Sequence, residues 1–202
     1  MKIASQLSIL LAVTLLVAGC TKEPPVAKFS IDKTTFKAEE KLTFTNESVN
    51  AETYAWDFGD GKKSTDLNPV HTYTSSGDFT IKLVATGKGG VDSIAQVINV
   101  HPNLSGMWRK TLTFSGGFFG INGTMNLTQH EDNTLTGSYV YEDGMGTIVL
   151  SPNSKVTGNT VEIIWEGGYY KFQGNVNPNG KTMAGNIVTT GGVDGTWTAK
   201  KL

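Results

Sequence analysis

The sequence predicts an all-β protein built from two successive β-rich regions. After the first 20 residues, short runs of alternating apolar and polar residues recur, and no stretch shows a sustained helical period. Turn sequences rich in Gly, Asn and Asp separate these runs. Seventeen of the 24 glycines follow residue 102, so the composition changes at His101-Pro102-Asn103. We therefore expect one β region over residues 26–100 and a second over residues 104–202.

The N-terminal segment has the features of an export signal. Lys2 precedes the apolar stretch Leu7–Ala18, which is shorter than the roughly 20 residues of a membrane-spanning helix. The ending Val17-Ala18-Gly19-Cys20 resembles the lipobox of bacterial lipoproteins. That resemblance implies removal of residues 1–19, lipidation of Cys20, and a tether over residues 20–25. An ordinary signal followed by a coincidental cysteine is the alternative. The lipoprotein interpretation predicts a membrane-anchored protein of the cell envelope, at the outer membrane or cell surface.

The first region is expected to contain six or seven strands. Odd-numbered positions from Phe79 to Ala85 are apolar and most even-numbered ones are polar, as in a strand with one buried face. The side chains of Tyr54, Trp56 and Phe58 form a second apolar column. The clearest predicted strands are Ala27–Ile31, Lys41–Asn46, Thr53–Phe58, Phe79–Ala85 and Ser93–Val100.

Three sequence motifs in this region carry a family resemblance. Trp56-Asp-Phe-Gly-Asp-Gly61, Asn68-Pro-Val-His-Thr-Tyr73 and Gly77-Asp-Phe-Thr-Ile-Lys-Leu83 follow one another in this order. Together they resemble the PKD domain over about 75 residues. The resemblance implies an immunoglobulin-like β-sandwich that serves as an extracellular spacer or binding module, usually without catalysis.

Four polar residues in and near these motifs allow two interpretations. The four residues are Asn46, Asp57, Asp60 and His71. In the functional interpretation, Asp57 and Asp60 are calcium ligands. Alternatively, Asp60 caps its turn and His71 packs beside Trp56. We favour the structural interpretation, because so few carboxylates supply too few of the six to eight oxygens that calcium needs. No bound metal is expected.

The second region repeats a strand in which glycine falls in the apolar column. Examples are Gly106-x-Trp108 and Gly195-x-Trp197 near the two ends of the region. About eight such strands with tight turns predict an antiparallel meander closed into a barrel. Inward glycines would let the sheet coil and leave space for Trp108 and Trp197. The first and last strands resemble those of calycin (lipocalin and avidin-like) barrels.

Candidate ligand contacts lie on the inward column and on one loop. Tyr139, Tyr141 and Trp165 are inward aromatics, and no carboxylate, histidine or arginine shares that column, so we expect an uncharged interior. Phe118 and Phe119 lie in a glycine-rich loop that could cover the barrel mouth or contact a partner. Alternatively, the loop is a hairpin whose phenylalanines pack into the end of the barrel or against the neighbouring region. A barrel of this size is filled by side chains or holds one small molecule. The two tryptophans favour a filled barrel.

The remaining chemistry argues against catalysis. The three histidines are scattered, the hairpin carboxylates do not form an inward pair, and no phosphate-binding loop precedes a helix. The net charge of −1 argues against binding to nucleic acid. We expect a non-catalytic surface lipoprotein without a cofactor that binds a glycan, a protein or a small apolar ligand. The alternatives are an inhibitor of a hydrolase, such as a protease or lysozyme, acting through the barrel loops, and a purely structural spacer.

Overall fold

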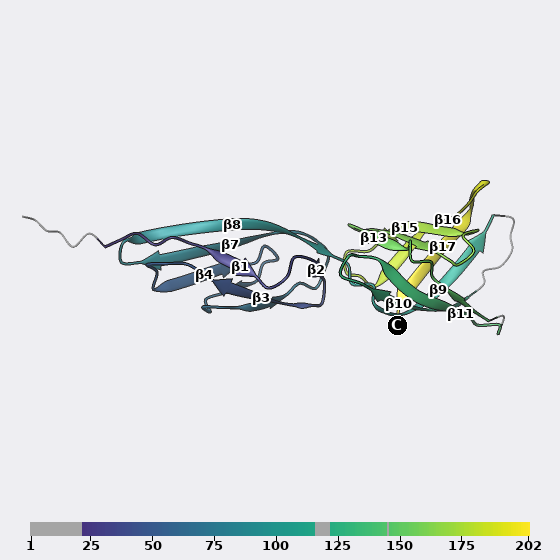
Figure 1. The fold of residues 1–202 in the computed structure, drawn as a ribbon, viewed down its shortest axis with the longest axis horizontal. Helices are drawn as coiled ribbons and strands as arrows, with labels where there is room; N and C mark the ends of the chain where they lie inside the picture. Colours follow the sequence, from purple (N-terminus) through teal and green to yellow (C-terminus); the bar gives the residue numbers. More distant parts are fainter. Residues whose placement is uncertain (1–21, 116–121, 145) are drawn as a thin grey trace, which may run out of the picture.

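A computed structural model describes residues 22–115, 122–144 and 146–202. Every regular element in these ranges is a β-strand, so the all-β prediction is confirmed. Figure 1 shows two β-rich parts placed end to end, an N-terminal sandwich and a C-terminal barrel. No helix within the described ranges is long and apolar enough to span a membrane. Cys20 precedes the first described residue, so its lipidation remains a prediction.

The N-terminal part consists of two facing sheets. Within the described residues, one sheet has the strand order β1-β3-β6 and the other the order β2-β8-β7-β4-β5. All neighbouring strands are antiparallel except β2 and β8, which run parallel. The strands are β1 (Phe29–Ile31), β2 (Phe36–Lys37), β3 (Lys41–Asn46), β4 (Thr53–Asp57), β5 (Lys63–Ser64), β6 (Val70–Thr72), β7 (Gly77–Gly87) and β8 (Gly90–His101).

Aromatic side chains fill the space between these two sheets. Trp56 on β4 is 1% exposed, and its indole nitrogen donates a hydrogen bond to the carbonyl oxygen of Asp66 at 3.0 Å. The Phe44 and Phe58 rings lie with their centres 5.8 and 6.5 Å from that of Trp56. Burial of this cluster supplies the apolar area that holds the sandwich together.

The C-terminal part is one curled antiparallel sheet. In the described residues its order is β12-β11-β10-β9-β17-β16-β15-β14-β13, so nine strands replace the eight expected. Bridges Leu150–Trp165 and Thr134–Lys155 join the two edges of the sheet and complete the barrel. The strands are β9 (Gly106–Phe114), β10 (Gly123–Gln129), β11 (Leu135–Tyr141), β12 (Thr147–Val149), β13 (Lys155–Thr157), β14 (Thr160–Ile164), β15 (Lys171–Val176), β16 (Thr182–Thr189) and β17 (Gly192–Lys201).

Glycines admit the large rings inside this barrel, as the sequence predicts. Trp108 and Trp197 are both buried. A Cβ added to Gly123 would lie 2.4 Å from the Tyr139 ring, so only glycine leaves room for that tyrosine. In the barrel core, a glycine on one strand therefore leaves the space that an aromatic ring from the neighbouring strand fills.

Polar contacts join the sandwich to the near end of the barrel. The buried Lys37 ammonium donates a hydrogen bond to the carbonyl oxygen of Gln129 at 3.3 Å. Ser76 bonds through its amide to the carbonyl oxygen of Pro178 at 2.8 Å and through its hydroxyl to Asn159 at 2.7 Å. These contacts, which come from loops far apart in sequence, orient the barrel relative to the sandwich.

Candidate functional site

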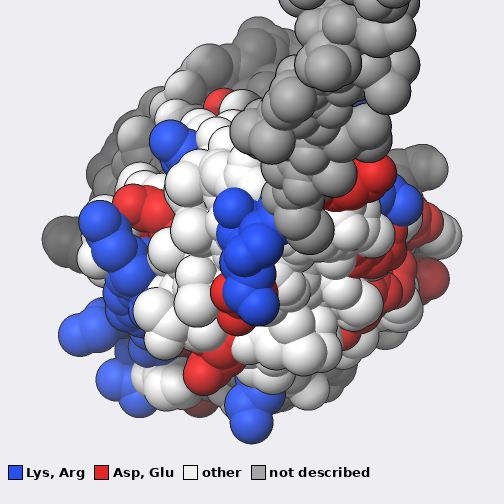
Figure 2. All heavy atoms as spheres, turned by 90° about the vertical axis from the view of Figure 1, so that its left-hand side faces the viewer, with Lys and Arg blue, Asp and Glu red and all other residues white. Residues whose placement is uncertain are grey.

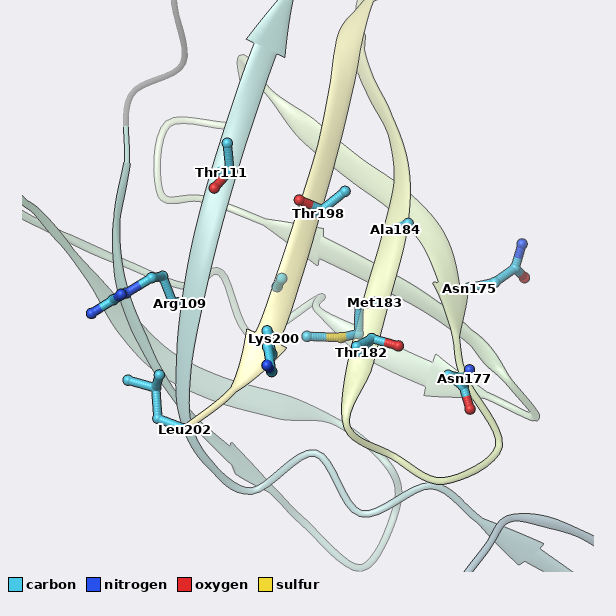
Figure 3. Close-up of a pocket in the computed structure, with 11 residues that line it drawn as sticks. Arg109, Thr111, Asn175, Asn177, Thr182, Met183, Ala184, Thr198, Lys200 and Leu202 are labelled. Atoms are coloured by element: carbon cyan, nitrogen blue, oxygen red, sulfur yellow. The ribbon is translucent and has the colours of Figure 1, made fainter.

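An open groove lies on the outer surface of the barrel. It has a volume of about 700 Å³ and lies over β9, β17, β16 and β15 (Figure 3). Thr111, Thr198, Ala184 and Asn175 are cross-strand neighbours and form one row of outward side chains across these strands. The lining mixes threonine and asparagine side chains with basic and apolar ones, and it contains no aromatic ring. It is an open, solvated face and lacks the enclosed apolar wall typical of a small-molecule site.

A second cavity, the mouth pocket, lies at the other end of the barrel from the sandwich. Its volume is about 240 Å³, and most of its wall is aromatic. The contributing rings belong to Phe114, Tyr139, Tyr141, Trp165, Tyr169, Tyr170 and Phe172. β9 runs from Gly106 at the junction to Phe114, which lines the pocket, so the pocket lies at the end of the barrel distant from the sandwich.

The local sequence explains why these rings converge. Tyr139 and Tyr141 are two residues apart on β11 and share a face of the strand. Trp165 follows β14, and its bridge to Leu150 holds it at the seam of the barrel. The Tyr139 ring centre lies 4.9 Å from that of Tyr141 and 5.6 Å from that of Trp165. Edge-to-face and tilted packing of this kind fixes the ring positions and leaves a rigid wall.

A buried lysine forms the floor of the mouth pocket. Lys110 on β9 is 1% exposed, and its cross-strand neighbours are the small residues Gly123 and Ala199. Its Nζ lies 3.6 Å from the Phe172 ring centre. The Tyr139 and Trp165 ring centres are each 4.5 Å away. We call these three rings, Tyr139, Trp165 and Phe172, the aromatic cage.

The cage and the burial of Lys110 act on its charge in opposite directions. Burial lowers the pKa of the Lys110 ammonium well below its usual value, because the charged form loses its hydration. The ring faces attract the cation and oppose part of this effect. Burial also raises the pKa of the Tyr139 and Tyr141 phenols, which keeps both hydroxyls protonated at neutral pH. The pocket therefore combines apolar walls with a few polar atoms able to orient a ligand.

The structure brings together three of the five predicted ligand contacts. Tyr139, Tyr141 and Trp165 all line the mouth pocket. Phe118 and Phe119 lie outside the described residues. The expectation of an uncharged interior is wrong, because Lys110 points inward between Trp108 and Leu112. The alternation Trp108-x-Lys110-x-Leu112 already places the lysine on the inward face.

The polar residues of the first region serve the fold. Asp60 accepts a hydrogen bond from the Lys62 amide at 3.1 Å, and its other oxygen lies 2.9 Å from Nε2 of His71. Asp57 accepts a hydrogen bond from the Gly59 amide, which lowers the pKa of its carboxyl. His71 stacks on Phe58, with ring centres 4.1 Å apart, rather than on Trp56 as expected. In the described ranges, no group of three or more His, Cys, Asp or Glu residues could hold a metal ion.

The chain thus joins a β-sandwich to a β-barrel that holds the mouth pocket. The family model for the PKD domain matches residues 22–101, which confirms the resemblance seen in the three motifs. The chain thus carries a PKD domain in its N-terminal part.

Known proteins similar to this chain cover mainly the PKD domain. The pre-pro-metalloprotease PrtV of Vibrio cholerae is 35% identical over 81 residues, which is 39% of this chain and 9% of PrtV. The crystal structure of the PKD1 domain of that metalloprotease is 30% identical, covering 39% of this chain and 98% of the domain, with a TM-score of 0.34. A redesigned β-barrel is 21% identical over 49% of this chain and 91% of its own, with a TM-score of 0.38.

Proposed function

We propose that this protein is a surface lipoprotein that uses the mouth pocket to bind a small, mostly apolar ligand. The aromatic-lined cavity of about 240 Å³ is the observation that carries the proposal. Ligand sites for drug-sized molecules usually measure about 300–1,000 Å³. The mouth pocket is smaller, and its volume fits one ring with a short substituent.

The arrangement of the chain supports a display role. In the proposed anchored form, lipid on Cys20 holds the start of the tether at the outer membrane. The PKD domain then serves as a spacer, and its polar contacts to the barrel keep the two parts aligned. In that arrangement the mouth pocket, at the end of β9 distant from the sandwich, would face away from the membrane. Both signs of charge occur on the opposite end, where the described chain begins (Figure 2).

A pocket-blocking pair of variants tests this function. Ile148 on β12 lines the mouth pocket, whereas the adjacent Val149 is exposed on the outer face. We expect Ile148→Trp to fill the cavity and abolish binding of single-ring compounds such as benzyl alcohol. Val149→Trp is the matched control, because it adds the same side chain outside the barrel.

Binding is measured by tryptophan fluorescence and by ligand-observed NMR on the mature chain carrying Cys20→Ser. Panels of ring compounds and of methyl glycosides separate an apolar ligand from a sugar. Equal binding by the Ile148→Trp and Val149→Trp variants would place the site elsewhere. Inhibition of a protease or lysozyme by the mature chain, unaffected by Ile148→Trp, would instead favour the hydrolase inhibitor.

A further inference from the structure

Lys110 differs from the other buried lysine, Lys37, and from the partly buried Lys201 in the kind of partner it has. Lys37 contacts the carbonyl oxygen of Gln129, and its Nζ lies 3.8 Å from the Glu131 carboxylate. Lys201 donates to the carbonyl oxygen of Asn103 at 2.9 Å. For Lys110 the contacts found in the described residues are ring faces, and no salt bridge joins it to a carboxylate there.

Ring faces compensate a buried ammonium only in part. An ammonium removed from water loses its hydration, and the attraction of the ring faces replaces only part of that lost stabilisation. The rings also leave its hydrogen-bonding capacity largely unused, because an ammonium has three donors. A ligand oxygen with a full negative charge would meet both requirements in this low-dielectric site.

The rest of the mouth pocket suits the apolar body of such a ligand. Phe114, Tyr170 and Leu112 provide apolar surface around the opening. The protonated Tyr141 hydroxyl is available at the wall as a donor to an anion. Glu166 is the one carboxylate in the lining, and it is exposed at the rim, where water and salt screen its repulsion.

We propose that the mouth pocket selects a free, ring-sized monocarboxylic acid whose carboxylate pairs with the Lys110 ammonium inside the aromatic cage. This inference rests on the proposed function and names its ligand class. The charge of the ligand complements the charge of the pocket floor, and its ring occupies the cavity of about 240 Å³.

Proton uptake is the signature of this pairing. The carboxylate requires the protonated lysine, so binding draws a proton onto Lys110 wherever the free protein holds the amine partly neutral. Affinity for the acid therefore falls as the pH rises, and affinity for an uncharged ring compound does not. The other titratable groups facing the cavity are Tyr139, Tyr141, Tyr169, Tyr170 and Glu166. The raised pKa of the Tyr139 and Tyr141 phenols keeps them neutral in this range, and the uncharged probe controls for the other three.

The test compares benzoate with benzyl alcohol, which share a ring and differ in charge. Calorimetric titration of the mature Cys20→Ser chain should show tighter binding of benzoate at about pH 6. Its heat should depend on the ionisation enthalpy of the buffer, as proton uptake requires. Lys110→Met should weaken the affinity for benzoate by at least about tenfold, equivalent to about 1.4 kcal/mol. The same substitution should leave the affinity for benzyl alcohol nearly unchanged.

Arg109→Met is the matched control, since Arg109 is the neighbouring residue and lies on the outer face. It removes the same charge and should leave the preference for benzoate intact. Equal affinity for the two probes, or benzoate binding independent of pH, would overturn the proposed ligand class. The mouth pocket would then remain the proposed site for an apolar ligand. Failure of both probes to bind would overturn the proposed function as well. If Lys110→Met does not fold, the pH comparison on the unsubstituted lysine decides alone.

Discussion

Trp197 on β17 lies directly opposite Gly185 on β16. The indole nitrogen of Trp197 donates to the carbonyl oxygen of Gln173, on the strand beyond, at 3.4 Å. Gly185 in turn faces Gly174 on β15, so the indole lies across two strands that present no side chain to it. The absence of two Cβ atoms thus leaves the space that the Trp197 indole occupies.

Alanine at Gly185 should destabilise the barrel strongly. A Cβ added there would lie 1.9 Å from the carbonyl oxygen of Gln173, so the backbone of β15 or β16 must move. We expect a loss of about 1–3 kcal/mol in the free energy of unfolding, measured by chemical denaturation. Gly191→Ala is the control, because its nearest neighbour would be the Thr189 hydroxyl at 3.7 Å. Similar stabilities for the two variants would contradict the packing role of Gly185.

Alanine at Trp56 should destabilise the PKD domain. Removal of a buried tryptophan typically costs about 3–5 kcal/mol. Trp56 is 1% exposed and lies at the centre of the aromatic cluster. In urea denaturation monitored by hydrogen exchange, the amides of β4 and β7 should lose protection at a lower urea concentration in the variant than in the parent. Val70→Ala, at an exposed position, serves as the control. An unchanged midpoint for Trp56→Ala would make this residue a surface contact.

The period-two pattern predicts most strands because one face of each strand is buried. The predicted strand Lys41–Asn46 coincides with β3, and Ser93–Val100 lies within β8. The short strands β2 and β5 contain two residues each, too few for alternation to be visible. Their formation depends on partners distant in sequence, since β2 pairs with β8 at the other end of the domain.

The candidate site could be predicted only in its aromatic part. Tyr139, Tyr141 and Trp165 follow the apolar column and are found at one cavity. Lys110 occupies the same kind of position but is polar, and polar residues in an alternating strand are normally assigned to the outer face. The alternation places Lys110 on the inward face, but the three rings that surround its ammonium come from distant strands, which no local pattern reveals. The contact between His71 and Phe58 is a tertiary detail of the same kind.

Substitution of Cys20 tests the membrane anchor. As the sole cysteine, at the end of an apolar N-terminal segment, it is the predicted site of lipidation. Cys20→Ser should abolish labelling by a fatty-acid analogue and shift the protein from the membrane fraction to the soluble fraction. Ser8→Ala, within the same segment, should retain both properties. Membrane association equal to that of the unsubstituted chain would disprove the assignment.

Phe118 and Phe119, which lie outside the described residues, are predicted ligand contacts. Phe114 lines the pocket, and Phe118 and Phe119 follow within five residues of it in the sequence. Replacing both with serine should weaken binding of ring compounds and leave the melting temperature unchanged. Unfolding of the double variant would assign the two phenylalanines to the core. Unchanged binding by a folded double variant would restrict the site to Tyr139, Tyr141, Trp165 and their neighbours.

Lys110 should make the stability of the folded protein increase with pH over part of the pH range. Its pKa in the folded protein is lowered well below the value of 10.5 for an exposed lysine. Between these two pKa values the unfolded chain binds more protons than the folded protein, so the stability of the folded protein rises with pH. Below that window the buried ammonium destabilises the folded state, and above it the amine is neutral in both states.

Lys110→Met removes this dependence and fills the same space with an apolar side chain. We expect the variant to be more stable than the parent at neutral pH, because a buried charge is replaced by a well-packed hydrophobic residue. Its advantage should shrink as the pH approaches about 10.5, as followed by urea denaturation at several pH values. Arg109→Met, on the exposed face of the same strand, should show no such trend. A constant difference between Lys110→Met and the parent across the pH range would mean that Lys110 keeps an ordinary pKa, with the aromatic cage compensating fully for its burial.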